Sequence, residues 1–257
     1  MFIPRAEMGP DGKLNPSKKI IILSGAGLDA PSGIQTFRGE KGLWNGHSID
    51  EICSEKTWKD NYLKVHKFYN ERRTELKTKE PNEVHLAIKE IISKCGKENV
   101  FNITQNVTDF FERIDTEVLH LHGELTKMEC SECYHKWDIG YEEFNPEDSC
   151  PKCNKEKAVR PAVVFYGGPA QMYSYLFRAF EYNLNPDTVV LIIGTSGEVL
   201  PINDLVQRKH GLVTNTILCN LEKQNHINEE FFSDIYYEDI SSAITKIQNK
   251  INNIKRS

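Results

Sequence analysis

The stretch Ile20-Ile21-Ile22-Leu23, followed at once by Ser24-Gly25-Ala26-Gly27, decides the fold class of this chain. Its four apolar residues are continuous and partly β-branched, which is typical of a strand buried on both faces of a parallel sheet. The glycines that follow indicate a tight turn, because glycine lets the backbone approach a ligand closely. The sequence therefore predicts a parallel strand at residues 20–23 with a glycine-rich loop at its carboxyl end.

Similar short apolar runs recur along the chain, at residues 100–103, 188–193 and 214–218. Helical patterns lie between or after these runs, at residues 83–93, 170–182 and 241–251. Strands that alternate with helices indicate a parallel sheet covered by helices on both faces. We therefore predict an α/β fold whose larger domain is a Rossmann-like parallel sheet.

Two stretches interrupt this alternation. Residues 41–82 are charged and helix-like, and residues 127–158 carry four of the seven cysteines. We interpret them as a helical insertion and a zinc module that together form a smaller inserted domain. Residues 1–17, broken by three prolines, are interpreted as a flexible leader to a catalytic domain of residues 18–257. The Rossmann-like core then comprises about residues 18–40, 83–126 and 159–257.

The composition and the apolar runs argue against three classes of protein: nucleic-acid-binding, membrane-spanning and secreted proteins. The 257 residues include 32 Lys and Arg against 37 Asp and Glu, a net charge of −5, which argues against binding to nucleic acid through phosphate contacts. No apolar run approaches the roughly 20 residues of a membrane helix. The N-terminus also lacks the apolar segment of a secretory signal. We expect a cytoplasmic monomer that binds neither nucleic acid nor a membrane.

The cysteine spacing indicates a metal site. Cys130-x-x-Cys133 is followed, after sixteen residues, by Cys150-x-x-Cys153. A gap of two residues lets both thiolates of a pair turn onto one tetrahedral ion, and two pairs complete a four-cysteine zinc site. The alternative, four unrelated thiols, is disfavoured by this spacing. Because four thiolates leave no open position, the zinc is expected to be structural.

Two loops are candidates for binding phosphate. Residues Gly25-Ala26-Gly27-Leu28-Asp29-Ala30 satisfy G-x-G-x-x-A after a strand, and a following helix N-terminus is expected to favour a phosphate. A tight turn without any ligand would show the same pattern. The second loop, Gly194-Thr195-Ser196-Gly197, follows the apolar run at 188–193. Because ligands bind at the carboxyl ends of parallel strands, two such loops favour a dinucleotide.

Seven motifs follow one another in order over about residues 18–250: Gly25-Ala26-Gly27 with Ser32-Gly33-Ile34-Gln35-Thr36-Phe37-Arg38, Thr104-Gln105-Asn106, His122-Gly123, the two cysteine pairs, Arg160-Pro161 with Val163-Val164-Phe165, Gly194-Thr195-Ser196, and Asn220-Leu221-Glu222. In this order and at these separations the chain resembles the sirtuin family of NAD-dependent protein deacylases. The resemblance implies NAD and one structural zinc as cofactors, and an acyl-lysine protein or peptide in the cleft between the domains. The implied products are the free lysine, nicotinamide and O-acyl-ADP-ribose.

The resemblance also assigns roles to residues. His122 is implied to be the general base, which suits an imidazole whose pKa is ordinarily about 6.5. Without the resemblance, His122 would be interpreted as a structural histidine near a turn. Asn106 is implied to bind the nicotinamide ribose. The other cofactor-binding residues implied are Gly25, Ala26, Gly27, Phe37, Arg38, Gln105, Thr108, Gly194, Thr195, Ser196, Asn220, Leu221 and Glu222.

Tyr69 and Arg72 bear on the acyl group. On a helix their spacing of three places both on one face, and the pair resembles the Tyr-x-x-Arg of the sirtuin branch that removes succinyl and malonyl groups. A guanidinium can bind an acyl carboxylate through two hydrogen bonds, and a phenol can add a third. The alternative is a core tyrosine beside a solvated arginine. We predict that acidic acyl groups are preferred, with acetyl groups also removed.

Three residues depart from the family pattern. Thr108 stands where the family has an aspartate that contacts the nicotinamide amide, and a hydroxyl brings no negative charge. Asp29 stands where serine is usual, and its carboxylate is expected to repel the pyrophosphate if it points inward. Gly168 replaces a glutamate. These departures motivate the alternatives of an NAD glycohydrolase, an ADP-ribosyltransferase or a weakly active nucleotide-binding relative. Dependence of NAD consumption on acyl-lysine peptide separates the deacylase from them.

Overall fold

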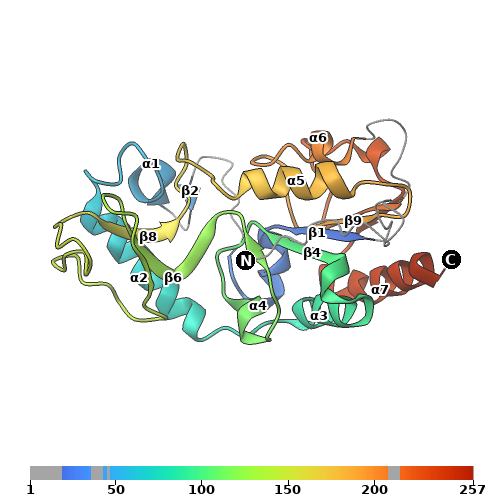
Figure 1. Cartoon of the computed structure of the whole chain (residues 1–257), viewed down its shortest axis with the longest axis horizontal. Coiled ribbons are helices and arrows are strands. Elements are labelled where there is room, and N and C mark those ends of the chain that lie inside the picture. The colour runs from blue at the N-terminus through green and yellow to red at the C-terminus, as the bar shows by residue number, and fades with distance from the viewer. Residues whose placement is uncertain (1–18, 36–42, 45–46, 208–214, 257) are drawn as a thin grey trace, which may run out of the picture.

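The computed structural model describes residues 19–35, 43–44, 47–207 and 215–256. Its larger part is a six-stranded parallel sheet with the strand order β11-β10-β9-β1-β4-β5 (Figure 1). The strands are β1 (Ile20–Ser24), β4 (Val100–Thr104), β5 (Leu119–His120), β9 (Val189–Ile193), β10 (Asn215–Asn220) and β11 (Asp234–Tyr237). The four predicted strands are thus present within two residues of their expected limits. The predicted α/β class with a Rossmann-like parallel sheet is confirmed.

Strand β1 lies inside the sheet between β9 and β4, and none of its five residues is exposed. Ile20 and Ile22 pack into the core on one face, whereas Ile21 and Leu23 pack into the core on the other. Helices α3 (Glu83–Cys95) and α7 (Ile240–Arg256) cover the first face, and α5 (Tyr173–Asn183) and α6 (Ile202–Val206) cover the second (Figure 1). Both faces are covered, which explains why the strand is continuously apolar.

The order of the strands reverses between β1 and β9, and in an open parallel sheet such a reversal marks the crevice in which ligands bind. From β1 the chain adds β4 and then β5 on one side, and it later returns to add β9, β10 and β11 on the other. Strand order therefore reverses between β1 and β9. In an open parallel sheet, loops diverge at such a point, and ligands bind beyond the carboxyl ends of the strands there.

A smaller unit lies at the other end of the molecule (Figure 1). It contains α1 (Ile49–Ile52), α2 (Tyr62–Lys77) and an antiparallel sheet of the order β7-β6-β8, formed by β6 (Gly123–Cys130), β7 (Lys136–Asp138) and β8 (Val159–Val163). Phe68 and Tyr69 of α2 share a core with Leu125 of β6 and with Phe165. The helical stretch and the cysteine-bearing stretch therefore pack together, and the sheet takes in residues 123–126 as well. The remaining elements are short: β2 (Leu43–Trp44), β3 (His47–Ser48), α4 (Phe110–Arg113) and several turns of 3-10 helix.

The prediction of an α-helix directly after the glycine turn is wrong for the described part of this segment, which extends to residue 35. Two single turns of 3-10 helix, Ala26–Leu28 and Ala30–Ser32, follow instead. Pro31, the second residue of the second turn, has no backbone N–H, and Gly33 ends that turn in the left-handed conformation at φ +76°. Any phosphate at this loop is therefore met by individual backbone groups and not by the dipole of a long helix.

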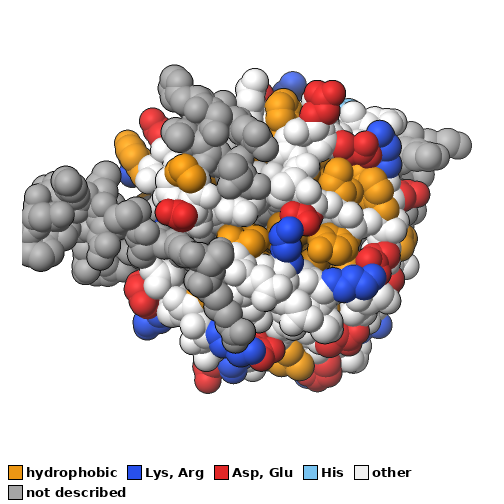
Figure 2. Space-filling model, turned by 90° about the vertical axis from the view of Figure 1, so that its right-hand side faces the viewer, with side chains coloured by type: hydrophobic (Ala, Val, Ile, Leu, Met, Phe, Trp, Pro, Cys, Tyr) orange, Lys and Arg blue, Asp and Glu red, His pale blue; other side chains and the backbone are white. Residues whose placement is uncertain are grey.

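Among the helices of the described ranges, none combines the length and apolar character that a membrane crossing requires. On the face shown in Figure 2, acidic and basic side chains are interspersed around a few apolar ones. That mixture fits the near balance of 32 basic against 37 acidic residues in the sequence.

Candidate active site

Three glycines bring the two predicted phosphate loops into direct contact. The Gly27 N–H donates to the Gly194 carbonyl at 2.8 Å. A Cβ added to Gly25 would lie 2.7 Å from that carbonyl oxygen, and one added to Gly27 would lie 2.7 Å from the Gly194 Cα. Gly194 itself has φ +66°, a left-handed conformation that favours glycine. The close contact of the two loops therefore requires glycine at these positions, whether or not a ligand also approaches them.

Polar side chains at the carboxyl ends of β4, β9 and β10 meet next to this crossing. Thr195 Oγ1 accepts a hydrogen bond from Gln105 Nε2 at 3.0 Å. The Asn220 amide bonds both the N–H and the carbonyl of Thr195, each at 3.0 Å. The predicted residues gathered here are Gly25, Ala26, Gly27, Gln105, Asn106, Gly194, Thr195, Ser196 and Asn220. Leu221 is 61% exposed and Glu222 is also exposed, both beyond the end of β10. Phe37 and Arg38 lie outside the described residues.

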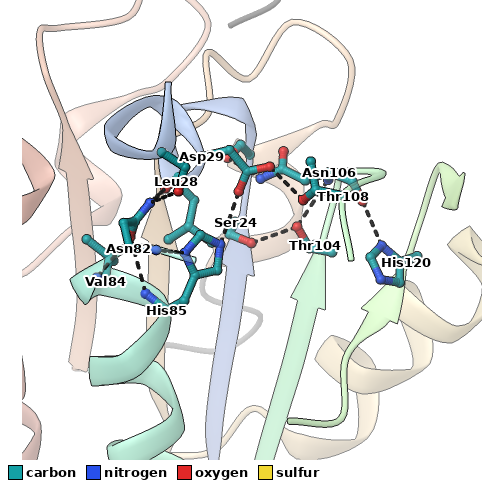
Figure 3. Close-up of polar contacts among 12 residues, drawn as sticks. Ser24, Leu28, Asp29, Asn82, Val84, His85, Thr104, Asn106, Thr108 and His120 are labelled. Atoms are coloured by element: carbon teal, nitrogen blue, oxygen red, sulfur yellow. Dashed lines mark hydrogen bonds and ion pairs between the residues drawn. The ribbon is translucent and has the colours of Figure 1, made fainter. Parts of the chain in front are cut away.

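Asn106 is held at three points (Figure 3). Its N–H donates to Thr104 Oγ1 at 3.0 Å, its Nδ2 donates to the Gly25 carbonyl at 3.0 Å, and its own carbonyl accepts from His120 Nδ1 at 2.7 Å. Burial alone would lower the pKa of His120, but the hydrogen bond and charge of Glu112, together with the Asn106 carbonyl and the charge of Glu124, raise that pKa. His120 is therefore a positioning residue for the Asn106 loop.

His122 is arranged as a neutral base. Burial lowers the pKa of His122, and a hydrogen bond to the Gln105 carbonyl offsets this only in part. In the tautomer that carries its hydrogen on Nδ1, Nε2 has the lone pair and accepts from Tyr173 Oη at 2.9 Å. Burial raises the pKa of Tyr173, which keeps the phenol protonated as the donor. Sequence reasoning missed Tyr173, because an aromatic residue in an amphipathic helix carries no signal of such a contact.

Asp29 is buried, with 2% of its surface exposed, and its carboxylate is engaged within the protein (Figure 3). Oδ2 accepts from Thr108 Oγ1 at 2.8 Å, and Oδ1 lies 3.2 Å from His85 Nε2 of α3. The predicted repulsion required a carboxylate that points into an open phosphate loop. Because the carboxylate is instead enclosed by two hydrogen-bonding side chains, that condition is not met. His85 was not singled out from the sequence.

A pocket next to this group is lined by Ile34, Gln35, Arg72, Glu75, Leu76, Val107, Thr108 and Leu125. The Arg72 guanidinium lies over the Phe68 ring at 5.3 Å, and Nη1 is 3.4 Å from Glu75 Oε2. Arg72 Nε is buried and has no hydrogen-bond partner among the described residues. Such an atom is a donor available to an acidic ligand.

Tyr69 does not line this pocket. Its ring is 1% exposed, stacks on Phe165 at 5.9 Å and meets Phe68 edge-on at 5.2 Å. Tyr69 and Arg72 therefore share Phe68 as a neighbour, with Arg72 at the pocket and Tyr69 in the core behind it. The adjacent Arg73 is buried and donates to the Glu142 carbonyl at 3.0 Å, so its role is structural.

The four cysteines of the small sheet converge. The Sγ atoms of Cys130 and Cys153 are 3.7 Å apart, as are those of Cys133 and Cys150, and all four lie within 4.8 Å of one another. Zinc–sulfur bonds of about 2.3 Å in a tetrahedron place the sulfurs about 3.8 Å apart, so this set fits zinc. His135, a histidine between the two cysteine pairs, is not part of this cluster and stacks on Trp137 with ring centroids 5.5 Å apart.

Comparisons with known proteins agree with this geometry. A model of the Sir2 family matches residues 25–201. The NAD-dependent protein deacylase of Campylobacter jejuni subsp. jejuni is 41% identical over 240 residues, which cover 93% of this chain and 98% of that protein. The protein of the same name from Helicobacter hepaticus is 37% identical over 250 residues, with 91% and 97% covered. The crystal structure of a Sir2 homologue–NAD complex matches with a TM-score of 0.77 at 28% identity, with 93% and 91% covered. This chain belongs to the Sir2 family, the sirtuins.

Proposed function

We propose that this chain is an NAD-dependent protein-lysine deacylase that prefers succinyl and malonyl groups and also removes acetyl groups. The observation that carries the proposal is the convergence of a neutral His122 and a triply held Asn106 beside the crossed glycine loops. Relatives named NAD-dependent protein deacylase and a Sir2 homologue–NAD complex of the same fold support it.

The residues at the sheet edge fit a dinucleotide. Gly25, Gly27 and Gly194 pack backbone against backbone, because a Cβ on any of them would clash with the opposite loop. Gln105 and Thr195 place amide and hydroxyl groups beneath it. When bound, NAD supplies a nicotinamide leaving group and an electrophilic ribose carbon that receives the acyl oxygen. The roles of Phe37, Arg38, Leu221 and Glu222 stay predictions from the family resemblance.

His122 moves a proton at Nε2. With the ring hydrogen on Nδ1, Nε2 is the basic atom, and burial lowers the pKa of His122, which favours the neutral ring. In the present structure Tyr173 donates to this lone pair. A ribose hydroxyl that docks at Nε2 replaces the phenol, and His122 then accepts its proton. Asn106 positions that ribose, since three hydrogen bonds fix the orientation of its loop.

Arg72 supplies the preference for acidic acyl groups. It lines a pocket with apolar walls at Ile34, Leu76, Val107 and Leu125, and with the polar residues Gln35, Glu75 and Thr108 beside them. A terminal carboxylate that enters this pocket meets the free Nε–H, and the guanidinium then exchanges Glu75 for the acyl group. Tyr69 packs against Phe68, and the Phe68 ring in turn lies under the Arg72 guanidinium, so Tyr69 helps to position Arg72. The four-cysteine zinc site stabilises the small sheet and takes no part in the chemistry, because it has no open position.

A mass-spectrometric assay tests the proposal. Acetyl-, malonyl- and succinyl-lysine peptides are incubated separately with the protein and NAD, and free lysine peptide and O-acyl-ADP-ribose are measured. We expect both products in equal amounts, formed fastest from the acidic acyl groups and lost in His122→Ala. NAD consumption at the same rate without any peptide would overturn the proposal in favour of a glycohydrolase.

The proposal also covers the cellular compartment, the oligomeric state and the partners of the enzyme. We infer that the enzyme acts on acyl-lysine proteins in the cytoplasm, as a monomer that binds neither nucleic acid nor a membrane. Four thiolates that hold zinc suit a reducing compartment. The interspersed charges of Figure 2 suit a freely diffusing protein.

A further inference from the structure

A second cavity lies where α4, β5 and the small antiparallel sheet meet. Its volume of about 210 Å³ has room for an ion with several waters, because one water occupies about 30 Å³ of liquid. Arg113 Nη2 neutralises one of its carboxylates, Asp109, at 3.0 Å, and the remaining surplus of negative charge favours a cation. The described charged side chains on the wall are four carboxylates and one ammonium group, those of Asp109, Glu112, Glu124, Asp138 and Lys127.

His120 is the most buried titratable side chain on this wall, with 8% of its surface exposed. Its Nδ1 lies 2.7 Å from the Asn106 carbonyl oxygen, as Figure 3 shows. A carbonyl only accepts, so Nδ1 carries a hydrogen, and the ring directs Nε2 toward Glu112. Histidines that bind a metal through one nitrogen usually donate the other N–H to a carbonyl or carboxylate in this way. The ring is therefore oriented as a metal ligand.

The contact between His120 and Glu112 also has the length expected of two metal ligands. Nε2 lies 3.0 Å from Glu112 Oε1. With the ring hydrogen on Nδ1, the lone pair of Nε2 faces a carboxylate, so either a proton or a metal cation must lie between these two acceptors. Two atoms bound at right angles to one ion, each at about 2.1 Å, are about 3.0 Å apart. A proton accounts for this contact alone, whereas an ion also uses a third ligand.

Glu124 supplies that third ligand from β6. The ligand atoms of Glu112, His120 and Glu124 all lie within 4.8 Å of one another. Opposite ligands of one ion are about 4.2 Å apart, so a small rotation of Glu124 closes the set. Lys127 Nζ now donates to Glu124 Oε1 at 2.8 Å. Because the Lys127 side chain is 39% exposed, its ammonium group can turn into water when an ion takes its place.

We propose that Glu112, His120 and Glu124 form a second metal site, which binds a divalent transition-metal ion such as Zn²⁺. The site goes beyond the proposed function and does not depend on it. An imidazole with two carboxylates suits Zn²⁺ better than Mg²⁺ or Ca²⁺, which prefer oxygen ligands alone. Three protein ligands leave positions for water, so this ion exchanges more readily than the zinc of the four cysteines. A bound ion also holds the His120 ring in the orientation that bonds the Asn106 carbonyl.

Calorimetry on the full chain tests the site. The protein is dialysed until one zinc per chain remains at the four cysteines, and Zn²⁺ or Mg²⁺ is then titrated. We expect one further equivalent of Zn²⁺ to bind and Mg²⁺ at the same concentration not to bind. Glu112→Gln and Glu124→Gln should each weaken Zn²⁺ binding by about tenfold or more, because each removes one anionic ligand. Glu117→Gln, an exposed change outside the cavity, is the matched control and should bind as wild type does.

Lys127→Met gives a change of opposite sign. It removes the cation that competes for Glu124, so Zn²⁺ should bind about two- to fivefold more tightly. Lys89→Met, an exposed change on α3 that removes the same charge, should leave the affinity close to that of wild type.

Nitrogen-15 NMR of wild type reads the ligand directly, and needs no variant that has to fold. The Nε2 resonance of His120 should shift when Zn²⁺ is added and stay in place with Mg²⁺. Three results overturn the site: an Nε2 resonance that does not respond, Glu112→Gln and Glu124→Gln that bind Zn²⁺ as tightly as Glu117→Gln, or Lys127→Met that binds no more tightly than Lys89→Met.

Discussion

The zinc module and the crevice at the sheet edge are two sites built in opposite ways. The four thiols of the module come from two short knuckles whose members are two residues apart. The crevice combines Gly25, Asn106, Tyr173 and Gly194, which come from distant parts of the chain. The module depends on a metal, whereas the crevice depends on close backbone packing. A site built from neighbouring residues can thus be predicted from the spacing of those residues in the sequence. A site built from distant segments can be predicted only when the packing of those segments is known.

Loss of the metal should give the largest effect. Cys150→Ser removes one ligand, so zinc is lost and the small sheet loses the centre of its core, which costs more than about 5 kcal/mol of stability. Metal content measured by mass spectrometry should fall from one zinc per chain to none, with a lower and less cooperative thermal transition. Cys95→Ser, outside the site, is the control and should keep its zinc. Full stability in zinc-free Cys150→Ser would contradict the structural role.

Gly194→Ala should break the crevice without touching the module. The added Cβ would lie 2.6 Å from the Leu28 nitrogen, and the residue would be held at φ +66°. Clash and strain together should cost about 3 kcal/mol in chemical denaturation and abolish NAD binding. Gly140→Ala is the matched control, with φ +57° but nothing within 4 Å of its Cβ. It should cost about 1 kcal/mol. Equal losses in the two variants would show that the crossing is not constrained.

Arg72→Met should lower desuccinylation much more than deacetylation. The variant keeps the length and apolar contact of the side chain but removes the guanidinium, so desuccinylation should fall about a hundredfold in kcat/KM while deacetylation changes much less. Arg178→Met, an exposed change on α5, should alter neither rate. If both activities fell equally in Arg72→Met, the assignment of Arg72 to the acyl carboxylate would be wrong.

Glu112→Gln should give the smallest effect, one that depends on pH. Glu112 raises the pKa of His120, so the pair stabilises the fold below about pH 6.5 and that contribution is lost as pH rises through the raised pKa. Removal of the carboxylate should therefore cost about 0.5–1 kcal/mol in urea denaturation at pH 5.5 and close to nothing at pH 9. Glu117→Gln, whose side chain is exposed, is the control. A larger loss at pH 9 than at pH 5.5 would contradict the pairing.

Much of the fold could be predicted because its signals are local. The run at residues 20–23 is a central strand, and the charged, helix-like stretch at residues 41–82 contains helix α2 (Tyr62–Lys77). The prediction of a helix after Gly27 failed, because Pro31 and Gly33 allow only short 3-10 turns there. Asp29 was expected to repel a bound pyrophosphate, because its neighbours in sequence indicate a phosphate loop. They do not show that its side chain turns toward His85 of α3.

By itself, the sequence determined the parallel sheet, the zinc ligands and the family. Apolar periodicity, a two-residue cysteine gap and ordered motifs are all properties of neighbouring residues. Only the tertiary structure decided that Gly25 lies against Gly194, that His122 meets Tyr173 from 51 positions away, and that Asp29 bonds Thr108. These contacts depend on which loops meet at the reversal of strand order between β1 and β9, and no local pattern encodes that meeting.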